Sequence, residues 1–300
     1  MNIRKVNSSG LVLLLALSLV ALAGAQEKRA ATGTHHSLWK IQGQQNAVYL
    51  LGSIHLLKKE DYPLPAPIEA AFTNSRISVF ETDIGAMENP EIAMKLATKG
   101  MLPAGQTLRD QLTPAIYLMF SNHVQKTGMP AQLFDSFTPA MATIALVALE
   151  IKKMGLDPEY GLDKHFFSRA RQENKTTVPL ETIDFQIGLM TDFSKEEGEL
   201  LMKTTVKDID KLESEFGDLL KAWQSGDSEK LEKLLNEAME EAPVIYKRLV
   251  TDRNRRWLSK IEELTRGKEN AIIIVGAGHL VGTNGVVELL KKKGYKVVQE

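Results

Sequence analysis

Two copies of a Gly-x-x-His-Leu motif stand near opposite ends of the chain, at Gly52–Leu56 and Gly276–Leu280. Each copy follows an apolar run that is typical of a buried strand. Two further apolar runs end in Glu-Thr, which places Glu81 and Glu181 directly after strands. Imidazole and carboxylate groups bind metal ions and exchange protons. Four such groups at four strand ends predict one polar site that could do chemistry.

Two neutral imidazoles and one carboxylate can hold a catalytic zinc ion while one position stays open to water. A second carboxylate can then accept the proton of that water as general base. The predicted metal ligands are His55, His279 and one glutamate, and the predicted base is the other glutamate. The sequence does not decide which of Glu81 and Glu181 has which role.

A simpler interpretation is that each histidine is an ordinary hydrogen-bonded residue. The repeated Gly-x-x-His frame weighs against it for two of them. Ordinary surface or capping roles are expected for the others, which follow a polar leader or lie on helices: His35, His36, His123 and His165.

An α/β sheet is the element that must position these groups, because ligands bind beyond the carboxyl ends of strands in open α/β sheets. The glycine after each strand is expected to take a positive φ and turn its histidine into the crevice. A strand, a helix and a strand at the end of the chain predict parallel pairing. Strands are predicted over residues 38–42, 47–51, 77–80, 177–180, 271–275 and 295–298.

The predicted fold is therefore a mixed, largely parallel central sheet with large helical insertions, over about 85–172 and 190–267. The repeated motifs suggest that the sheet consists of two duplicated halves. Pro179 interrupts the run before Glu181, which indicates either an edge strand or the start of a strand.

The N-terminus has the pattern of a signal peptide. Arg4 and Lys5 precede an apolar run, Leu11–Gly24, which is short for a membrane span. Small residues at Ala23 and Ala25 fit a cleavage site, so residues 1–25 are predicted to be removed and 26–300 to form a single domain. An uncleaved membrane anchor is the alternative. The prediction is a periplasmic or secreted protein without a stable membrane span.

Composition excludes several classes. The chain has 300 residues, a net charge of −1 and no cysteine. No basic run is long enough to follow a phosphate backbone, so nucleic acid is not an expected partner. Without cysteine there is no lipid anchor on Cys, no disulfide, no thiolate zinc site and no thiol nucleophile. Gly276–Gly282 is similar to a dinucleotide-binding turn, but too few residues follow it, and no nucleotide cofactor is predicted.

The chain resembles the TraB/GumN family, which is related to the Tiki proteins, along most of the sequence after the leader. The matching pieces are short, but they share order and spacing. They are Leu38-Trp-Lys40, Tyr49-Leu-Leu-Gly-Ser-Ile-His55, Phe80-Glu-Thr-Asp83, Tyr160-Gly-Leu-Asp163 with His165-Phe166, Val178-Pro-Leu-Glu-Thr182 with Gln186, Asp252-Arg-Asn254 and Val275-Gly-Ala-Gly-His-Leu280.

This resemblance implies a fold in which both motifs and the first glutamate meet in one pocket, similar to erythromycin-esterase-like and haem-binding ChaN-like proteins. Tiki proteins are metal-dependent peptidases. By position, the resemblance makes His55, Glu81 and His279 the metal or catalytic centre. It makes Arg253 a group that can stabilise an oxyanion. The resemblance implies that Tyr160, Asp163 and Asn254 support the pocket. The alternative for Tyr160 and Asp163 is that they fix the start of a helix near it.

The resulting hypothesis is an exported hydrolase that uses a divalent metal ion to cleave a peptide or another acyl bond. Two alternatives remain open. In the first, a metal-free esterase, histidine and glutamate activate water directly. In the second, a non-catalytic protein binds a partner, a metal or haem at the same histidines.

Overall fold

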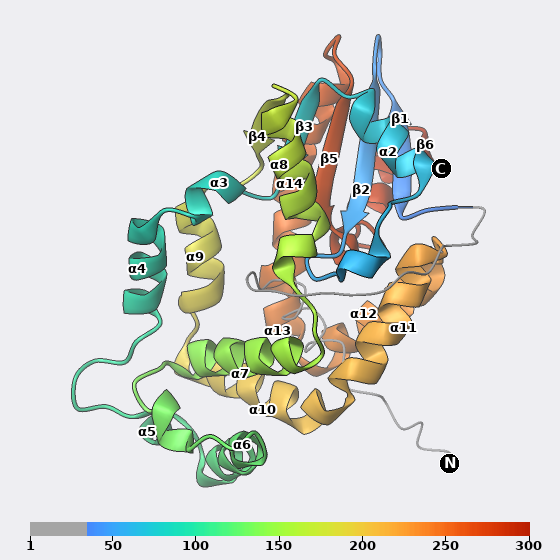
Figure 1. Cartoon of the computed structure of the whole chain (residues 1–300). Coiled ribbons are helices and arrows are strands. Elements are labelled where there is room, and N and C mark those ends of the chain that lie inside the picture. The colour runs from blue at the N-terminus through green and yellow to red at the C-terminus, as the bar shows by residue number, and fades with distance from the viewer. Residues whose placement is uncertain (1–34) are drawn as a thin grey trace, which may run out of the picture.

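The computed structural model describes the chain from His35 to Glu300, apart from the side chains of residues 236–240. The predicted signal peptide lies outside the described residues. A six-stranded sheet with the order β4-β3-β5-β2-β1-β6 forms the centre of the fold (Figure 1). The strands are β1 (Leu38–Gln42), β2 (Ala47–Ser53), β3 (Ile77–Phe80), β4 (Thr176–Pro179), β5 (Ala271–Gly276) and β6 (Val297–Gln299).

The sheet is mixed, as the sequence predicts. Strands β4, β3, β5 and β2 are parallel neighbours, and β1 pairs antiparallel with both β2 and β6. The predicted parallel pairing of the last strand is wrong. Because β2 and β3 occupy both edges of β5, the last strand joins the free edge of β1, which runs in the opposite direction.

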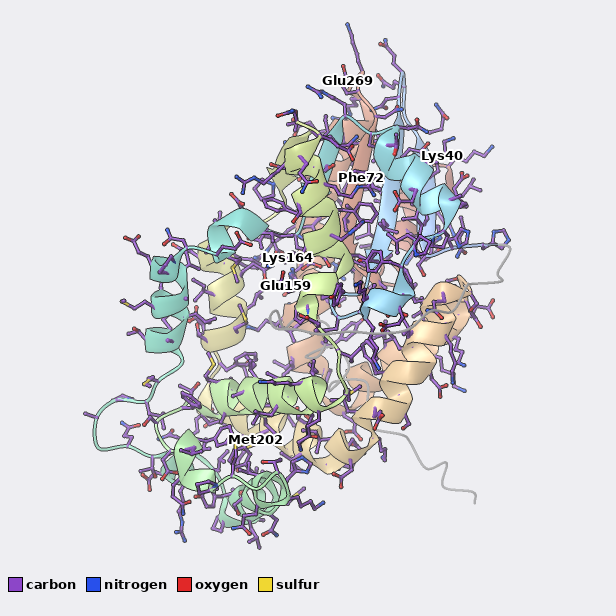
Figure 2. The ribbon with its side chains drawn as sticks, viewed as in Figure 1. Lys40, Phe72, Glu159, Lys164, Met202 and Glu269 are labelled. Carbon is purple, nitrogen blue, oxygen red and sulfur yellow. The ribbon has the colours of Figure 1, made fainter. Side chains whose placement is uncertain are left out.

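Helices cover both faces of the sheet. Helices α2 (Ala66–Thr73) and α8 (Leu162–Gln172) lie on one face, and α14 (Asp252–Thr265) and α15 (Val286–Lys292) lie on the other (Figure 1). Phe72 of α2 points into this core, where its ring centroid lies 4.7 Å from that of Phe166 (Figure 2). Every residue of β5 is buried, which explains its unbroken apolar sequence.

Two helical insertions extend away from the sheet. Several of their helices begin at a proline, whose missing N–H is not needed in the first turn. Between β3 and β4 lie α3 (Ile84–Met87), α4 (Pro90–Lys99), α5 (Leu108–Gln111), α6 (Pro114–Lys126), α7 (Pro139–Lys153) and α8. Between β4 and β5 lie α9 (Ile183–Thr191), α10 (Lys195–Asp208), α11 (Leu212–Gln224), α12 (Ser228–Glu241), α13 (Pro243–Tyr246) and α14.

The insertions share one continuous hydrophobic core with the sheet, and Met202 of α10 is fully buried in it below α7 (Figure 2). Helix α9 was not predicted from the sequence. Within residues 35–300 no helix is long and apolar enough to cross a membrane. Short helical turns complete the fold: η1 (Lys59–Asp61), η2 (Ala131–Phe134), η3 (Pro158–Tyr160), η4 (Ile209–Lys211), the π-helical η5 (Lys247–Thr251) and η6 (Ala277–His279).

The repeated motifs lie side by side in the sheet. The two strands that end in Gly-x-x-His-Leu, β2 and β5, are neighbours, and so are the two that end in Glu-Thr, β3 and β4. Since all four run parallel, their carboxyl ends lie at one edge. Duplication of a half-sheet remains a prediction.

The second insertion is tied to the first motif through Trp223 of α11. Its indole N–H donates to the carbonyl of Gly52 at 2.6 Å in a buried position. Ser37 completes the link, because its hydroxyl donates to the carbonyl of Trp223 at 3.2 Å and its own carbonyl accepts the N–H of Gly52 at 2.8 Å. These bonds hold helix α11 against the end of β2.

Replacing Trp223 with Phe is expected to lower the free energy of unfolding by about 1–3 kcal/mol, because it leaves the buried carbonyl of Gly52 without its donor. Urea denaturation followed by circular dichroism measures this loss. A change below about 0.5 kcal/mol, the range of ordinary surface substitutions, would show that the bond contributes little.

Candidate functional site

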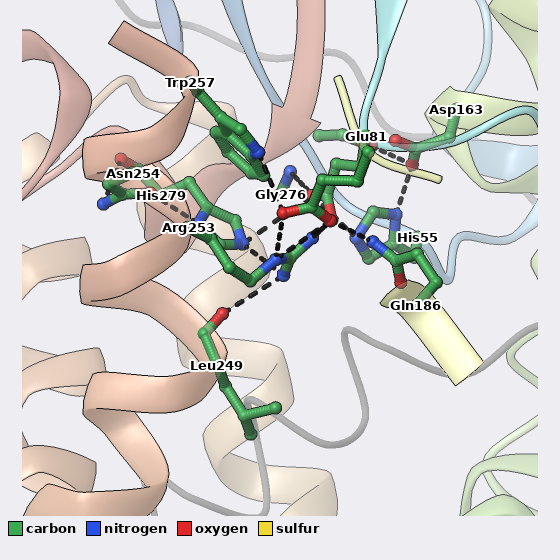
Figure 3. A network of polar contacts seen from close by, with 12 residues as sticks. His55, Glu81, Asp163, Gln186, Leu249, Arg253, Asn254, Trp257, Gly276 and His279 are labelled. Atoms are coloured by element: carbon green, nitrogen blue, oxygen red, sulfur yellow. Dashed lines mark hydrogen bonds and ion pairs between the residues drawn. The ribbon is translucent and has the colours of Figure 1, made fainter. Parts of the chain in front are cut away.

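The carboxyl ends of four parallel strands bring together the four side chains that the sequence places there. Figure 3 shows three of them, His55, Glu81 and His279, around one polar centre. His55 follows β2, Glu81 follows β3, Glu181 follows β4, and His279 lies in the turn η6 after β5. The backbone N–H of Glu181 donates to the carbonyl of Glu81 at 2.9 Å, which continues the strand pairing beyond β3 and β4. One network of polar contacts therefore joins residues more than 220 positions apart in the chain.

Glu81 lies at the centre of this network. Its Oε1 atom is 3.8 Å from Nε2 of His55 and 3.8 Å from Nε2 of His279, and accepts the N–H of Gly276 at 2.7 Å. Its Oε2 atom accepts a hydrogen bond from Arg253. Burial alone would raise the pKa of Glu81, but the Arg253 guanidinium and both imidazoles outweigh it and hold the pKa well below its usual range. Glu81 is therefore a carboxylate at neutral pH.

His279 has a fixed neutral tautomer. The amide N–H groups of Asn254 donate to the carbonyls of His279 and Asn284, at 3.1 and 2.8 Å. The amide oxygen of Asn254 must then accept from Nδ1 of His279, 2.7 Å away. This leaves a lone pair on Nε2, which accepts from Nη1 of Arg253 at 3.0 Å. Burial, reinforced by Arg253, lowers the pKa of His279 to about 3.

His55 has a charged partner instead of an amide. Its Nδ1 and the hydroxyl of Ser53 both hydrogen-bond Oδ2 of Asp163. Nδ1 is therefore protonated, and in the neutral ring Nε2 carries a lone pair on the side of Glu81. Burial lowers the pKa of His55, but Asp163 and Glu81 outweigh it, and the net effect raises the pKa above 6.5.

Arg253 joins the two glutamates from the other side. Its Nη2 donates to both Glu81 and Glu181, and its Nε donates to Glu181 at 2.9 Å. Glu181 also accepts from the indole of Trp257 at 2.9 Å and from the amide of Gln186 at 2.6 Å. Glu181 is thus enclosed by donors, and its direct contacts hold Arg253 in place.

One helix supplies three of these partners. On α14, Trp257 comes four residues after Arg253 and three after Asn254, so it is a neighbour of both on the helix surface. The π-helical turn η5 immediately precedes them, and the carbonyl of Leu249 within it accepts from Nη1 of Arg253 at 3.1 Å. Single π-helical turns often occur at functional sites, where they change the direction of side chains.

The motif glycines have a different role from the predicted one. Gly276 has a φ of −48°, and neither it nor Gly52 is among the positive-φ residues. A Cβ on Gly276 would lie 3.2 Å from Nε2 of His55 and 3.4 Å from Oε1 of Glu81, and one on Gly52 would lie 3.2 Å from Ala277. Glycine at these two positions lets the backbone approach the site closely, and neither glycine makes a positive-φ turn.

The three residues expected to support the pocket differ in what they contact. Asp163 contacts His55 directly from the first turn of α8, and Asn254 contacts His279. Tyr160 takes part through its backbone, since its carbonyl accepts from the hydroxyl of Tyr62 at 2.7 Å. A Cβ on the neighbouring Gly161 would lie 2.2 Å from the carbonyl oxygen of His55, so glycine lets α8 begin beside the motif.

Sequence reasoning assigned no role to three residues of the network, Ser53, Gln186 and Trp257, although Ser53 and Gln186 stand in pieces that match the family. Trp257 could have been found from its spacing to Arg253 on one helix face. Gln186 lies five residues after Glu181 on α9, a helix that the sequence did not predict. Ser53 is the x residue after the first motif glycine, a position the motif leaves open.

The donor types of the site suit a divalent ion, because two imidazole Nε2 atoms and a carboxylate oxygen face one another and each imidazole is held at Nδ1 by an outer partner. In the described part of the chain, no group of three or more His, Cys, Asp or Glu side chains is arranged as a metal-binding cluster. The guanidinium of Arg253 contacts two of the three donor groups, His279 and Glu81.

The fold and site define an α/β protein with a buried His-Glu-His centre at the carboxyl ends of parallel strands. The chain belongs to the TraB/PrgY/gumN family, whose model matches residues 37–299. It is 23% identical over 243 residues to the uncharacterized protein YbaP of Escherichia coli, covering 81% of this chain and 87% of YbaP. No solved structure shows a significant match.

The chain is also similar to proteins named as metalloproteases. It is 25% identical over 342 residues to metalloprotease TIKI1 of Homo sapiens, which covers 91% of this chain and 66% of TIKI1. TIKI1 of Xenopus tropicalis is 23% identical over 345 residues, with 93% of this chain and 66% of that protein covered. The chain therefore spans about two thirds of these relatives.

Replacing Gly276 with Ala is expected to disturb the site while the protein still folds, because the new methyl group lies against His55 and Glu81. We expect a loss of about 1–3 kcal/mol in the free energy of unfolding and displacement of the His55 ring signals in NMR spectra. Gly217→Ala on α11 is a matched control, since a Cβ there has no atom within 4 Å. Unchanged His55 signals in the Gly276 variant would contradict the close-approach role.

The two histidines are expected to titrate differently in protein treated with a chelator. Ring NMR signals should show His279 neutral down to about pH 3 and His55 protonating above pH 6.5. Because an unfolded histidine titrates at 6.5, the contribution of His279 to stability is present above pH 6.5 and falls as the pH drops below it.

The contribution of His55 has the opposite sign: it is present below pH 6.5 and is lost as the pH rises through the folded pKa. Because the chain has six histidines, two single variants, His55→Gln and His279→Gln, assign these two signals by the one that disappears from each spectrum. Titration of His279 near pH 6.5 would contradict the proposed tautomer and its contact with Arg253.

Proposed function

We propose that this protein is an exported hydrolase that cleaves a peptide or another acyl bond at the His55–Glu81–His279 centre with a bound divalent metal ion. The observation that carries the proposal is the arrangement of these three side chains. Two imidazoles present Nε2 toward the same carboxylate oxygen, each at 3.8 Å, and each is fixed at Nδ1 by a hydrogen bond from behind. Outer partners of this kind orient histidine ligands in metal sites.

The charge of the site supports a cation at this position. With both imidazoles neutral, as metal binding requires, the carboxylates of Glu81, Asp163 and Glu181 and the guanidinium of Arg253 leave two negative charges in a largely buried region. Without a metal ion, a proton on His55, whose pKa is raised, balances one of them. Uncompensated buried charge is costly, and a divalent ion would balance it. The names of the TIKI relatives as metalloproteases support the same class of reaction.

Hydrolysis of an acyl bond needs an activated water and a donor for the charge that develops on the acyl oxygen. A bound metal ion would supply acidity to the water and polarise the carbonyl. Of the two glutamates, Glu81 faces both histidines and is the proposed ligand. Glu181 is held by Arg253, Trp257 and Gln186 and is proposed to position Arg253.

A metal-free hydrolase is the second candidate, and one observation favours it. Asp163 supports His55 at Nδ1 in the way that a carboxylate orients the base of a catalytic triad. In this scheme neutral His55 takes a proton from water at Nε2 and returns it to the leaving group. Both schemes need His55, but only the first needs His279 as a ligand and fails after metal removal.

We expect the purified protein to contain a divalent metal ion by elemental analysis and to cleave members of a mixed peptide library, read by mass spectrometry. A chelator should abolish cleavage, and added Zn²⁺ should restore it. The double variant His55→Ala, His279→Ala should lose both metal and cleavage while its circular dichroism spectrum stays unchanged.

His123→Gln is the matched control, because His123 is also a buried histidine but lies away from the site. Its partners are Glu150 of α7 and Asp210 of η4. Metal retained by the double variant would overturn the proposed ligands. Cleavage that resists the chelator but is lost in His55→Ala would identify the metal-free scheme.

A further inference from the structure

Every nitrogen of the Arg253 guanidinium is already engaged. Nε lies 2.9 and 3.2 Å from the two carboxylate oxygens of Glu181. Nη1 donates to the carbonyl of Leu249 and to Nε2 of His279, at 3.1 and 3.0 Å. Nη2 donates to Glu81 and, at 2.9 Å, to Glu181. Since a guanidinium carries five N–H donors, these acceptors use all of them.

An oxyanion donor needs a free N–H that points to the reacting oxygen. Arg253 has none in this arrangement, so the role that the family resemblance implies cannot be exercised until one of its contacts breaks. Its bonds to the carbonyl of Leu249 and to both oxygens of Glu181 hold the side chain in position. The two that remain are His279 and Glu81, which are also two of the proposed metal ligands.

We infer that Arg253 is the resident cation of the site and competes with a divalent metal ion for His279 and Glu81. This inference rests on the ligands of the proposed function. Binding of an ion at Nε2 of His279 and at Glu81 requires Arg253 to give up one Nη1–H and one Nη2–H bond. Its contacts with Glu181 and Leu249 keep the guanidinium in the site after that release.

Electrostatic repulsion between the Arg253 guanidinium and a divalent ion determines how strongly the two compete. A guanidinium and a divalent cation that share the same acceptors repel each other, and this repulsion is weakly screened because Arg253 is 5% exposed. The same carboxylates stabilise either cation. Arg253 therefore sets the metal affinity of the site. When a bound metal ion displaces Arg253 from His279 and Glu81, two N–H groups of the guanidinium become free beside the reacting centre.

The test measures Zn²⁺ binding to chelator-treated protein by competition with a chromogenic chelator. In Arg253→Met, which has a neutral side chain of similar length, we expect Zn²⁺ to bind about 100-fold more tightly than in the wild type, since a repelling charge next to the ion is removed. Arg253→Lys keeps the charge and is expected to stay within about 10-fold of the wild type.

Two further variants keep the experiment decisive. Arg253→Met leaves Glu181 without its cation, so the double variant Arg253→Met, Glu181→Gln removes that unpaired charge and keeps one acceptor oxygen, which the indole of Trp257 can use. Arg256→Met is the matched control: it removes a cation from the same helix, at an exposed position over the ring of Phe185, and should leave Zn²⁺ affinity unchanged.

The absorption spectrum of Co²⁺ identifies the site that is filled. Its visible bands should appear in Arg253→Met and disappear when His279→Ala is added. Tighter Zn²⁺ binding in Arg253→Met supports the inference, even if the wild type binds no metal and the metal-dependent function fails. Equal or weaker binding than in a metal-binding wild type overturns the inference and leaves the proposed function standing. Absence of binding in every variant overturns both.

Discussion

The ion pairs of Arg253 with Glu81 and Glu181 are the interaction on which the rest of the site depends. Both carboxylates and the guanidinium are largely removed from water, and the loss of one partner from such a group typically costs about 3–5 kcal/mol. The order of the sheet places the two glutamates on neighbouring strands. Helix α14 then brings a single cation within reach of both, and this fixes α14 against the ends of β3 and β4.

The two histidines show how one short motif yields two different chemical groups. Each imidazole is held at Nδ1, but the partner is a carboxylate for His55 and an amide oxygen for His279. The carboxylate favours the protonated ring, whereas burial and the neighbouring guanidinium disfavour it. The motif therefore specifies where an imidazole lies, and the residues behind it, Asp163 and Asn254, decide its charge.

The sequence was sufficient to predict the strands and the residues at their ends, because apolar runs and the polar residues that follow them are local signals. It could not predict the position of β6, which depends on which strand edges remain free after the others have paired. The sequence predicts a turn at Gly276, whereas its role is close approach to His55 and Glu81. These neighbours follow other strands, so the residues around Gly276 in the sequence do not indicate them. The contacts of Arg253 with the glutamates and with His279, and the tautomer of His279, depend on partners more than 20 residues away, so only the folded chain shows them.

Trp257 places an indole, which fluoresces, directly in the site. Its ring centroid lies 4.5 Å from that of His279, and its indole N–H is bonded to Glu181. The other tryptophans, Trp39 and Trp223, belong to β1 and α11. Indole emission depends on the charge and hydrogen bonding of its immediate surroundings. The centre thus contains a built-in fluorophore, through which events at His279 and Glu181 can be followed without a label or a known substrate.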